Sequence, residues 1–103
     1  MNIADFNTLV NNRIKEITTT LETKGTEYGS KDRLHNFKAA GRITNKTPAK
    51  ALWGMAMKHL VSVEDLIEGR LLNNRKNVNE KIGDLINYLI LLEAVLEDVR
   101  EIK

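Results

Sequence analysis

A repeat of apolar residues near the C-terminus constrains the fold more than any other feature of the sequence. Between residues 78 and 99 apolar side chains recur at alternating spacings of four and three, which places them on one face of an α-helix. The members of this repeat are Val78, Ile82, Leu85, Leu89, Leu92, Leu96 and Val99. Because further apolar residues flank the repeat, we expect this helix to pack against partners on more than one side. The flanking residues are Ile86, Ile90, Leu91 and Val95.

The first half of the chain predicts one long and one short helix. Apolar residues at spacings of three and four indicate a helix over about residues 3–20, and Gly25 is expected to end it. Ser30 suits the N-cap of a shorter helix over about residues 32–43, and Gly41 is expected near its end.

Clear capping signals mark the second half. Thr47 and Pro48 suit the N-cap and first position of a third helix, which is expected to end at Gly69 or at the polar run after Leu72. Asn77 and Glu80 have the spacing of a capping box and are expected to begin the fourth helix. The chain, 1–103, is therefore predicted to be a single all-α domain, a small bundle of three long helices and one short helix. The apolar width of the last helix also predicts a homo-oligomer.

Composition and charge narrow the class of protein. The chain has no cysteine, so disulfides and thiolate metal sites are excluded. We see no secretory signal and no apolar run long enough to cross a bilayer, so we expect a cytoplasmic protein without a membrane partner. Residues 24–50 hold seven cationic side chains against two carboxylates, whereas residues 78–103 hold three against six. This asymmetry suggests an anionic partner for the basic middle, or charges that pair across the fold.

The segment 25–42 interrupts the helical pattern with glycines and cations, which favours a site for an anionic small molecule. The start of a helix there exposes backbone N–H groups, Tyr28 or Phe37 suits stacking on a base, and Asn36 suits reading its edge. There is no phosphate-loop fingerprint. A double-helical nucleic acid is the less favoured partner, because the cations are spread over the segment without a recognition helix. The candidate ligand-binding residues are Tyr28, Lys31, Arg33, His35, Asn36, Lys38, Lys58, His59 and Asn87.

Plainer interpretations stay open for three of these side chains. Tyr28 and Phe37 suit packing in the bundle. His59 falls on the apolar side of its helix, where a core histidine is more common than a catalyst.

Four carboxylates on the last two helices form a candidate metal site. Asp65 and Glu68 are three residues apart, and Glu80 and Asp84 are four apart, so each pair shares a helix face. Two helices packed side by side would bring the four together and supply the oxygen ligands that Mg²⁺ requires. The alternative is that Glu80 belongs to the capping box, that Asp84 interacts favourably with the helix dipole near the start of the helix, and that Asp65 and Glu68 are solvated.

The chain contains six short motifs in a fixed order: Tyr28-Gly29, Asp32-Arg33-Leu34, Asn36-Phe37-Lys38-Ala39-Ala40, Lys58-His59-Leu60-Val61-Ser62, Glu80-Lys81-Ile82-Gly83-Asp84 and Ile86-Asn87-Tyr88-Leu89. In this combination, residues 20–95 resemble a group of small uncharacterised bacteriophage and prophage proteins. The resemblance implies a protein of the bacterial host cytoplasm and carries no assigned function.

The stretch Glu80-Lys81-Ile82-Gly83-Asp84 is also similar to the last metal-binding helix of the all-α nucleotide pyrophosphohydrolases, the MazG-like family. That family holds Mg²⁺ with an E-x-x-E pair and a later E-x-x-D pair, which often reads E-E-x-G-D, and hydrolyses nucleoside triphosphates. Asp84 matches the later pair, but Lys81 stands where a ligand is expected, and residues 65–68 match the earlier pair imperfectly. The resemblance implies an all-α fold and a nucleotide-like ligand more than it implies catalysis. Mg²⁺ would be a cofactor only if the protein is an enzyme.

Three functions follow from these observations. The preferred one is non-catalytic binding, in which a phage protein sequesters a nucleotide or nucleotide-derived signal and so counters host defence. The alternative is a Mg²⁺-dependent nucleoside triphosphate pyrophosphohydrolase. A weaker alternative is a helical adaptor that inhibits a host protein through its surface and needs none of the polar sites.

Overall fold

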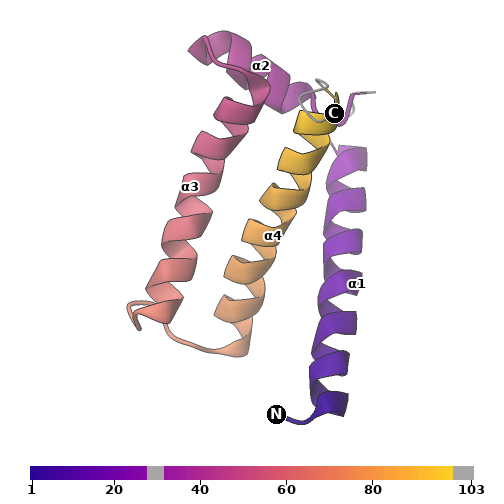
Figure 1. The fold of residues 1–103 in the computed structure, drawn as a ribbon, viewed down its shortest axis with the longest axis vertical. Helices are drawn as coiled ribbons and strands as arrows, with labels where there is room; N and C mark the ends of the chain where they lie inside the picture. Colours follow the sequence, from indigo (N-terminus) through magenta and orange to yellow (C-terminus); the bar gives the residue numbers. More distant parts are fainter. Residues whose placement is uncertain (28–31, 99–103) are drawn as a thin grey trace.

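The structure is a computed structural model that describes residues 1–27 and 32–98, and side chains up to 23 and from 32 to 98. These residues form four helices and no strand: α1 (Ile3–Glu27), α2 (His35–Thr44), α3 (Pro48–Ile67) and α4 (Arg75–Asp98). Helices α3 and α4 make an antiparallel hairpin, α2 crosses its open end, and α1 runs beside α4 in the same direction (Figure 1). The prediction of an all-α chain with three long helices and one short helix is confirmed for the described residues. None of the described helices combines the length and apolarity that a bilayer crossing requires.

Two predicted boundaries of the long helices are wrong. Gly25 does not end α1, because a glycine inside a helix lowers its stability by only about 1 kcal/mol relative to alanine and the helix continues past it. Helix α4 begins at Arg75, two residues before the predicted start. The side-chain oxygen of Asn74 accepts a hydrogen bond from the backbone N–H of Asn77 at 2.8 Å, so Asn74 takes the capping role. Glu80 consequently belongs to no capping box at Asn77.

The short helix α2 also differs from the prediction at both ends. Ser30, the expected N-cap, lies outside the described residues. The side chain of Asp32 accepts a hydrogen bond from the N–H of Leu34 at 3.0 Å, and the helix begins after this turn. Gly41 does not end α2 but allows close packing, since a Cβ at this position would lie 2.8 Å from the carbonyl oxygen of Lys46.

The start of α3 agrees with the sequence. The hydroxyl of Thr47 accepts a hydrogen bond from the backbone N–H of Lys50 at 3.2 Å, and Pro48 occupies the first helical position. Helix α3 ends at Ile67, and Gly69 follows with a φ of 76°, a conformation that glycine adopts without steric cost.

The core lies where α2 crosses the α3–α4 hairpin. Leu52 of α3 and Val95 of α4 are 0% and 1% exposed, and they pack with Leu34 and Phe37 from the α2 region. Val95 lies outside the four–three repeat, whose member Leu89 is 47% exposed. The C-terminal half of α4 therefore packs through a face rotated from the predicted seam, on the side where Val95 meets Leu34, Phe37 and Leu52.

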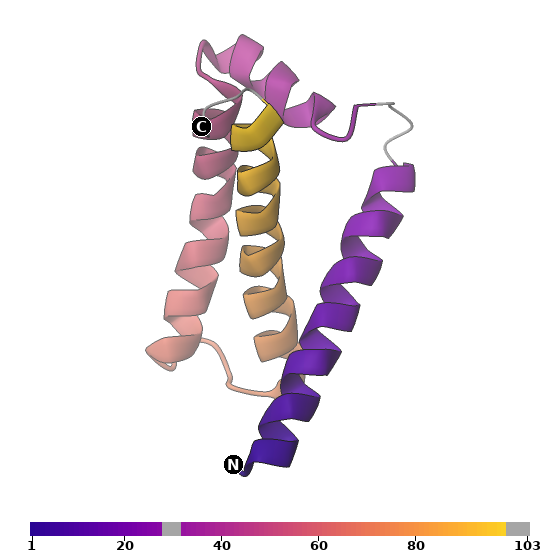
Figure 2. The same cartoon turned by 45° about the vertical axis from the view of Figure 1, so that its right-hand side comes forward.

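Helix α1 contacts α4 through polar groups. The guanidinium of Arg13 donates to the backbone oxygen of Asn79 at 3.1 Å and to its side-chain oxygen at 3.0 Å, and the Asn79 amide donates to Glu16 at 3.1 Å. Gly83 makes room for this contact, since a Cβ there would lie 2.7 Å from Nη1 of Arg13. Away from this contact α1 diverges from α4 towards its C-terminal end (Figure 2). The small size and polar character of the contact leave much of the apolar face of α1 exposed.

We expect Leu52→Ala to lower the free energy of unfolding by about 2–5 kcal/mol, because it removes a fully buried side chain and leaves a cavity. Leu72→Ala is the matched control, since Leu72 is 70% exposed and its truncation should change stability by no more than about 0.5 kcal/mol. Urea titration followed by circular dichroism measures both values. Equal losses in the two variants would contradict the placement of the core.

Gly83→Ala and Gly54→Ala form a second matched pair, because both lie inside helices but only Gly83 faces Arg13. A Cβ at Gly54 meets nothing within 4 Å, so this variant should gain about 0.5–1 kcal/mol of stability from helix propensity. Gly83→Ala should gain about 1 kcal/mol less, because it displaces the hydrogen-bonded Arg13. Amide hydrogen exchange should show faster exchange in α1 for Gly83→Ala alone. Unchanged exchange in α1 would refute the role of Gly83.

Candidate functional site

Among the pockets that the described residues form, two adjoining ones between α1 and α4 share lining residues, and we term these two together the α1–α4 groove. The first has a volume of about 340 Å³, and the second, nearer to α2, has a volume of about 250 Å³. Thr20 of α1 and Asp84 and Asn87 of α4 line both. The groove therefore has one polar seam that continues from the first pocket into the second.

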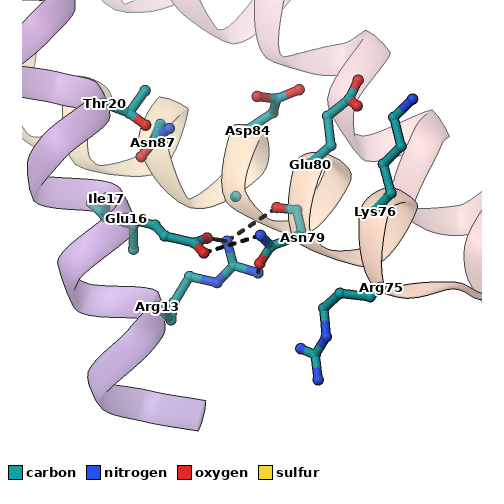
Figure 3. A pocket seen from close by; sticks show the side chains of 11 residues that line it. Arg13, Glu16, Ile17, Thr20, Arg75, Lys76, Asn79, Glu80, Asp84 and Asn87 are labelled. Atoms are coloured by element: carbon teal, nitrogen blue, oxygen red, sulfur yellow. Dashed lines mark hydrogen bonds and ion pairs between the residues drawn. The ribbon is translucent and has the colours of Figure 1, made fainter. Parts of the chain in front are cut away.

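The first pocket is lined mainly by charged and amide side chains. Figure 3 shows Arg13 and Glu16 of α1 converging on Asn79, while Lys76, Glu80 and Asp84 project along one side of α4. Its lining holds three cations and three carboxylates, namely Arg13, Arg75 and Lys76 with Glu16, Glu80 and Asp84. With this balance the pocket has no strong preference for a highly charged anion.

The second pocket combines apolar and aromatic walls with a few polar groups. All four helices or their ends contribute to it: Thr20, Leu21, Arg33, Asn36, Phe37, Met55, Asp84, Asn87, Tyr88 and Leu91. Phe37 packs edge-on against Tyr88, with their ring centroids 6.5 Å apart, so core packing fixes both rings. This composition, an apolar wall with a few convergent polar groups, is typical of small-molecule sites.

Asn87 occupies a particular position in this seam. Its side-chain oxygen is buried and has no hydrogen-bond partner among the described residues. A buried acceptor without a partner costs about 1–3 kcal/mol. Asn87 is therefore prepared to accept a hydrogen bond from a ligand that enters the groove.

Behind the pocket, His59 of α3 connects two of its lining residues. The imidazole lies against the ring of Tyr88 with centroids 4.6 Å apart, and Nδ1 is 3.7 Å from a carboxylate oxygen of Asp84. This distance is longer than a hydrogen bond, so the contact is an ion pair only when His59 is protonated. His59 itself lines neither pocket. Its place against Tyr88 fits the packing interpretation of this residue, with Asp84 as its polar neighbour.

The structure brings some of the predicted ligand-binding residues together. Arg33, Asn36 and Asn87 line the second pocket, although they are far apart in the sequence. Tyr28 and Lys31 lie outside the described residues. The remaining ones, His35, Lys38, Lys58 and His59, line neither pocket.

Lys38 is held in an ion-pair cluster on the surface. Its amino group lies 2.7 Å from Asp32 and 2.9 Å from Asp98, which joins the start of α2 to the end of α4. The hydrogen bond to Asp32 raises the pKa of Lys38, and the same hydrogen bond lowers the pKa of Asp32. Lys38 therefore links α2 to the end of α4 by surface ion pairs and does not line the groove.

The four predicted metal ligands are not gathered into one site. Within residues 1–23 and 32–98, no group of three or more histidine, aspartate and glutamate side chains is placed to hold a metal ion. Asp65 instead accepts a hydrogen bond from Arg70 at 2.7 Å, and Glu80 pairs with Lys81 at 3.1 Å. Glu80 and Asp84 line the groove, whereas Asp65 and Glu68 line neither pocket.

The sequence alone did not identify the contribution of α1 to the groove. Arg13, Glu16 and Thr20 of α1 were not among the predicted site residues, yet all three line it. The only signal in the sequence is Gly83, since an isolated glycine inside a helix often marks a close approach by a neighbouring element. Which element approaches depends on the tertiary structure.

Lys38→Met should raise the pKa of Asp32 towards its ordinary value near 3.8, because the cation that stabilises the carboxylate is lost. In the native protein the pair should be intact between about pH 3.8 and 10.5. Its stabilisation is lost as the pH falls through the lowered pKa of Asp32, or rises through the raised pKa of Lys38. NMR titration of the Asp32 carboxyl carbon measures the change. Lys46→Met, at an exposed position, is the control, and an equal shift in both variants would contradict the assignment.

Comparisons with models of protein families, with curated proteins and with solved structures give no match to this chain. The resemblances to small phage proteins and to the MazG-like family consequently stay predictions.

Proposed function

We propose that the protein binds a nucleotide or nucleotide-derived molecule in the α1–α4 groove and holds it without turning it over. The observation that carries this proposal is the second pocket, where Asn36 and the buried oxygen of Asn87 lie among the side chains of Phe37 and Tyr88. A nucleobase presents a flat apolar surface and an edge of N–H donors, which suits such walls and such an acceptor. The base-binding part of the groove is therefore the second pocket.

The adjoining first pocket offers room for the sugar and phosphate. Arg33 at the second pocket, with Arg75 and Lys76 at the first, supplies cations for a phosphate. The carboxylates of Glu16, Glu80 and Asp84 oppose a large negative charge there. We therefore expect a ligand with few charges, a nucleoside monophosphate or a cyclic nucleotide, rather than a triphosphate.

The placement of the carboxylates favours binding over hydrolysis. A Mg²⁺-dependent pyrophosphohydrolase needs several carboxylates that converge on one ion, and residues 65 and 68 do not line the groove that Glu80 and Asp84 line. Lys81 also occupies a ligand position of the family motif. Sequestration of a host signal would suit a phage protein, and this part of the proposal rests on the resemblance to phage proteins.

Isothermal titration calorimetry with a panel of nucleoside mono-, di- and triphosphates and cyclic nucleotides tests the proposal. Arg33→Ala should raise the dissociation constant of the bound nucleotide by about 10-fold or more, since it removes a charge-assisted hydrogen bond. Arg42→Ala is the matched control, because Arg42 is exposed in the last turn of α2 and lines neither pocket. If no nucleotide in the panel binds, or if both variants weaken binding equally, the proposal is wrong.

The same samples separate binding from hydrolysis. Mass spectrometry of the nucleotide after incubation, with and without Mg²⁺, should recover it unchanged in both conditions. Release of a monophosphate only with Mg²⁺, abolished by Asp84→Asn, would instead support the pyrophosphohydrolase. A chain that binds no nucleotide would leave the helical adaptor as the better account.

A further inference from the structure

The chain exposes more surface than a compact protein of its size. Its accessible surface is 7582 Å², whereas a compact monomer of this mass exposes about 5,900 Å². Its radius of gyration is 15.6 Å, against about 13 Å for a compact domain of this length. The excess of about 1,700 Å² is within the range that one subunit of a stable homodimer buries, roughly 1,000–2,500 Å².

Part of the exposed apolar surface lies on α1. Ile3, Phe6 and Ile14 are 80%, 54% and 57% exposed, although they belong to the apolar stripe of the helix. The contact of α1 with α4 uses Arg13 and Glu16, and Val10 and Ile17, which complete the stripe, are only half-buried, so packing within the subunit covers the stripe only in part.

The stripe is symmetrical along the helix, and this symmetry indicates what covers it. Ile3 and Ile17 lie seven residues on either side of Val10, and Phe6 and Ile14 lie four residues on either side. With 3.6 residues per turn, all five side chains fall within about 40° of the direction of Val10. A second α1 that runs antiparallel, with a two-fold axis at Val10, would therefore oppose Ile3 to Ile17 and Phe6 to Ile14.

Charge is compatible with the same arrangement. The charged side chains of this part of α1 are Asp5, Arg13, Lys15 and Glu16. A two-fold axis at Val10 brings Asp5 level with Lys15 of the other copy, Arg13 level with Asn7 and Glu16 level with Ala4, so no charge opposes a like charge. Self-complementarity of this kind is what a two-fold symmetric interface requires, because each surface must fit its own copy.

We propose that the apolar stripe of α1 is a homodimer interface, in which two copies of the chain pack their α1 helices antiparallel about Val10. This inference is independent of the ligand. It has a consequence for the groove, because Arg13, Ile17 and Thr20 of α1 line its first pocket. The dimer would hold this wall in place through hydrophobic packing on the adjacent flank of α1, with Ile17 at the edge shared by the interface and the groove, in addition to the polar contact with α4.

Sedimentation equilibrium over a range of concentrations tests the interface. The wild-type chain should have twice the 11.7 kDa monomer mass, and Phe6→Glu or Ile14→Lys should weaken dimerisation by about tenfold or more. Val61→Lys is the matched control, because Val61 is 58% exposed on α3 and should leave the mass unchanged. Circular dichroism checks that each variant keeps its helical content.

Mixing the two α1 variants tests the antiparallel register. In a mixed dimer the glutamate that replaces Phe6 faces the lysine that replaces Ile14, and the other pair stays apolar, so the mixture should recover dimers that neither variant forms alone. A parallel pairing would not recover them. Because the chain has no cysteine, Val10→Cys should also crosslink efficiently with a short bismaleimide, whereas Asn12→Cys on the far side of α1 should not.

A wild-type chain that is monomeric at all concentrations would overturn the proposal, as would dimers that resist both α1 substitutions. Failure of the mixture to dimerise together with failure of Val10→Cys to crosslink would refute the antiparallel register. Binding of a monomeric wild-type chain to phosphatidylcholine vesicles, lost in Phe6→Glu, would assign the stripe to a lipid surface instead and would also overturn it.

Discussion

Packing at the crossing of α2 over the α3–α4 hairpin positions most of the second pocket. Leu52 and Val95 are completely or almost completely buried there, and Phe37 is held against Tyr88. The same packing places the start of α2 against the C-terminal half of α4. Asn36 and Asn87, which belong to different helices, consequently line one pocket. The Lys38 cluster adds a polar connection between α2 and the end of α4.

The other wall of the groove depends on a contact of a different kind. Helix α1 is fixed to α4 by the hydrogen bonds of Arg13 and Glu16 with Asn79, at a point where Gly83 lacks a side chain. Partly exposed hydrogen bonds contribute only modestly to stability, because water competes for the same groups. The position of α1 is therefore the part of the groove that is most sensitive to a ligand or to a second copy of the chain.

These two contacts differ in what they require of the rest of the molecule. The apolar core keeps α2, α3 and α4 together through surface that is already buried. Helix α1 keeps its apolar stripe exposed, and a symmetrical partner is the arrangement that would bury it without rearranging the subunit. Ligand binding and dimerisation would then act on the same helix from two sides, so each would favour the other if both select one position of α1.

The helices could be located from the sequence, because their capping signals and apolar periodicity are local. Thr47 with Pro48 favours the start of a helix through local contacts alone, and spacings of three and four identify α1 and α4 without reference to a neighbour. The sequence also indicated Arg33, Asn36 and Asn87 as candidate residues. The predicted helix boundaries were less exact, because two nearby asparagines could each cap α4 and the structure shows Asn74, not Asn77, in this role.

Only the tertiary structure decided which faces meet. The repeat in α4 did not reveal that Val95 would be buried and Leu89 exposed, because this depends on where α2 crosses. Asp65 pairs with Arg70 and not with the other predicted metal ligands, and Lys38 pairs with Asp32 and not with a ligand site, because these partners lie close by in the folded chain. Arg13 reached Asn79 across 66 residues of sequence. Such contacts depend on the relative placement of helices, and no periodicity within one helix encodes that placement.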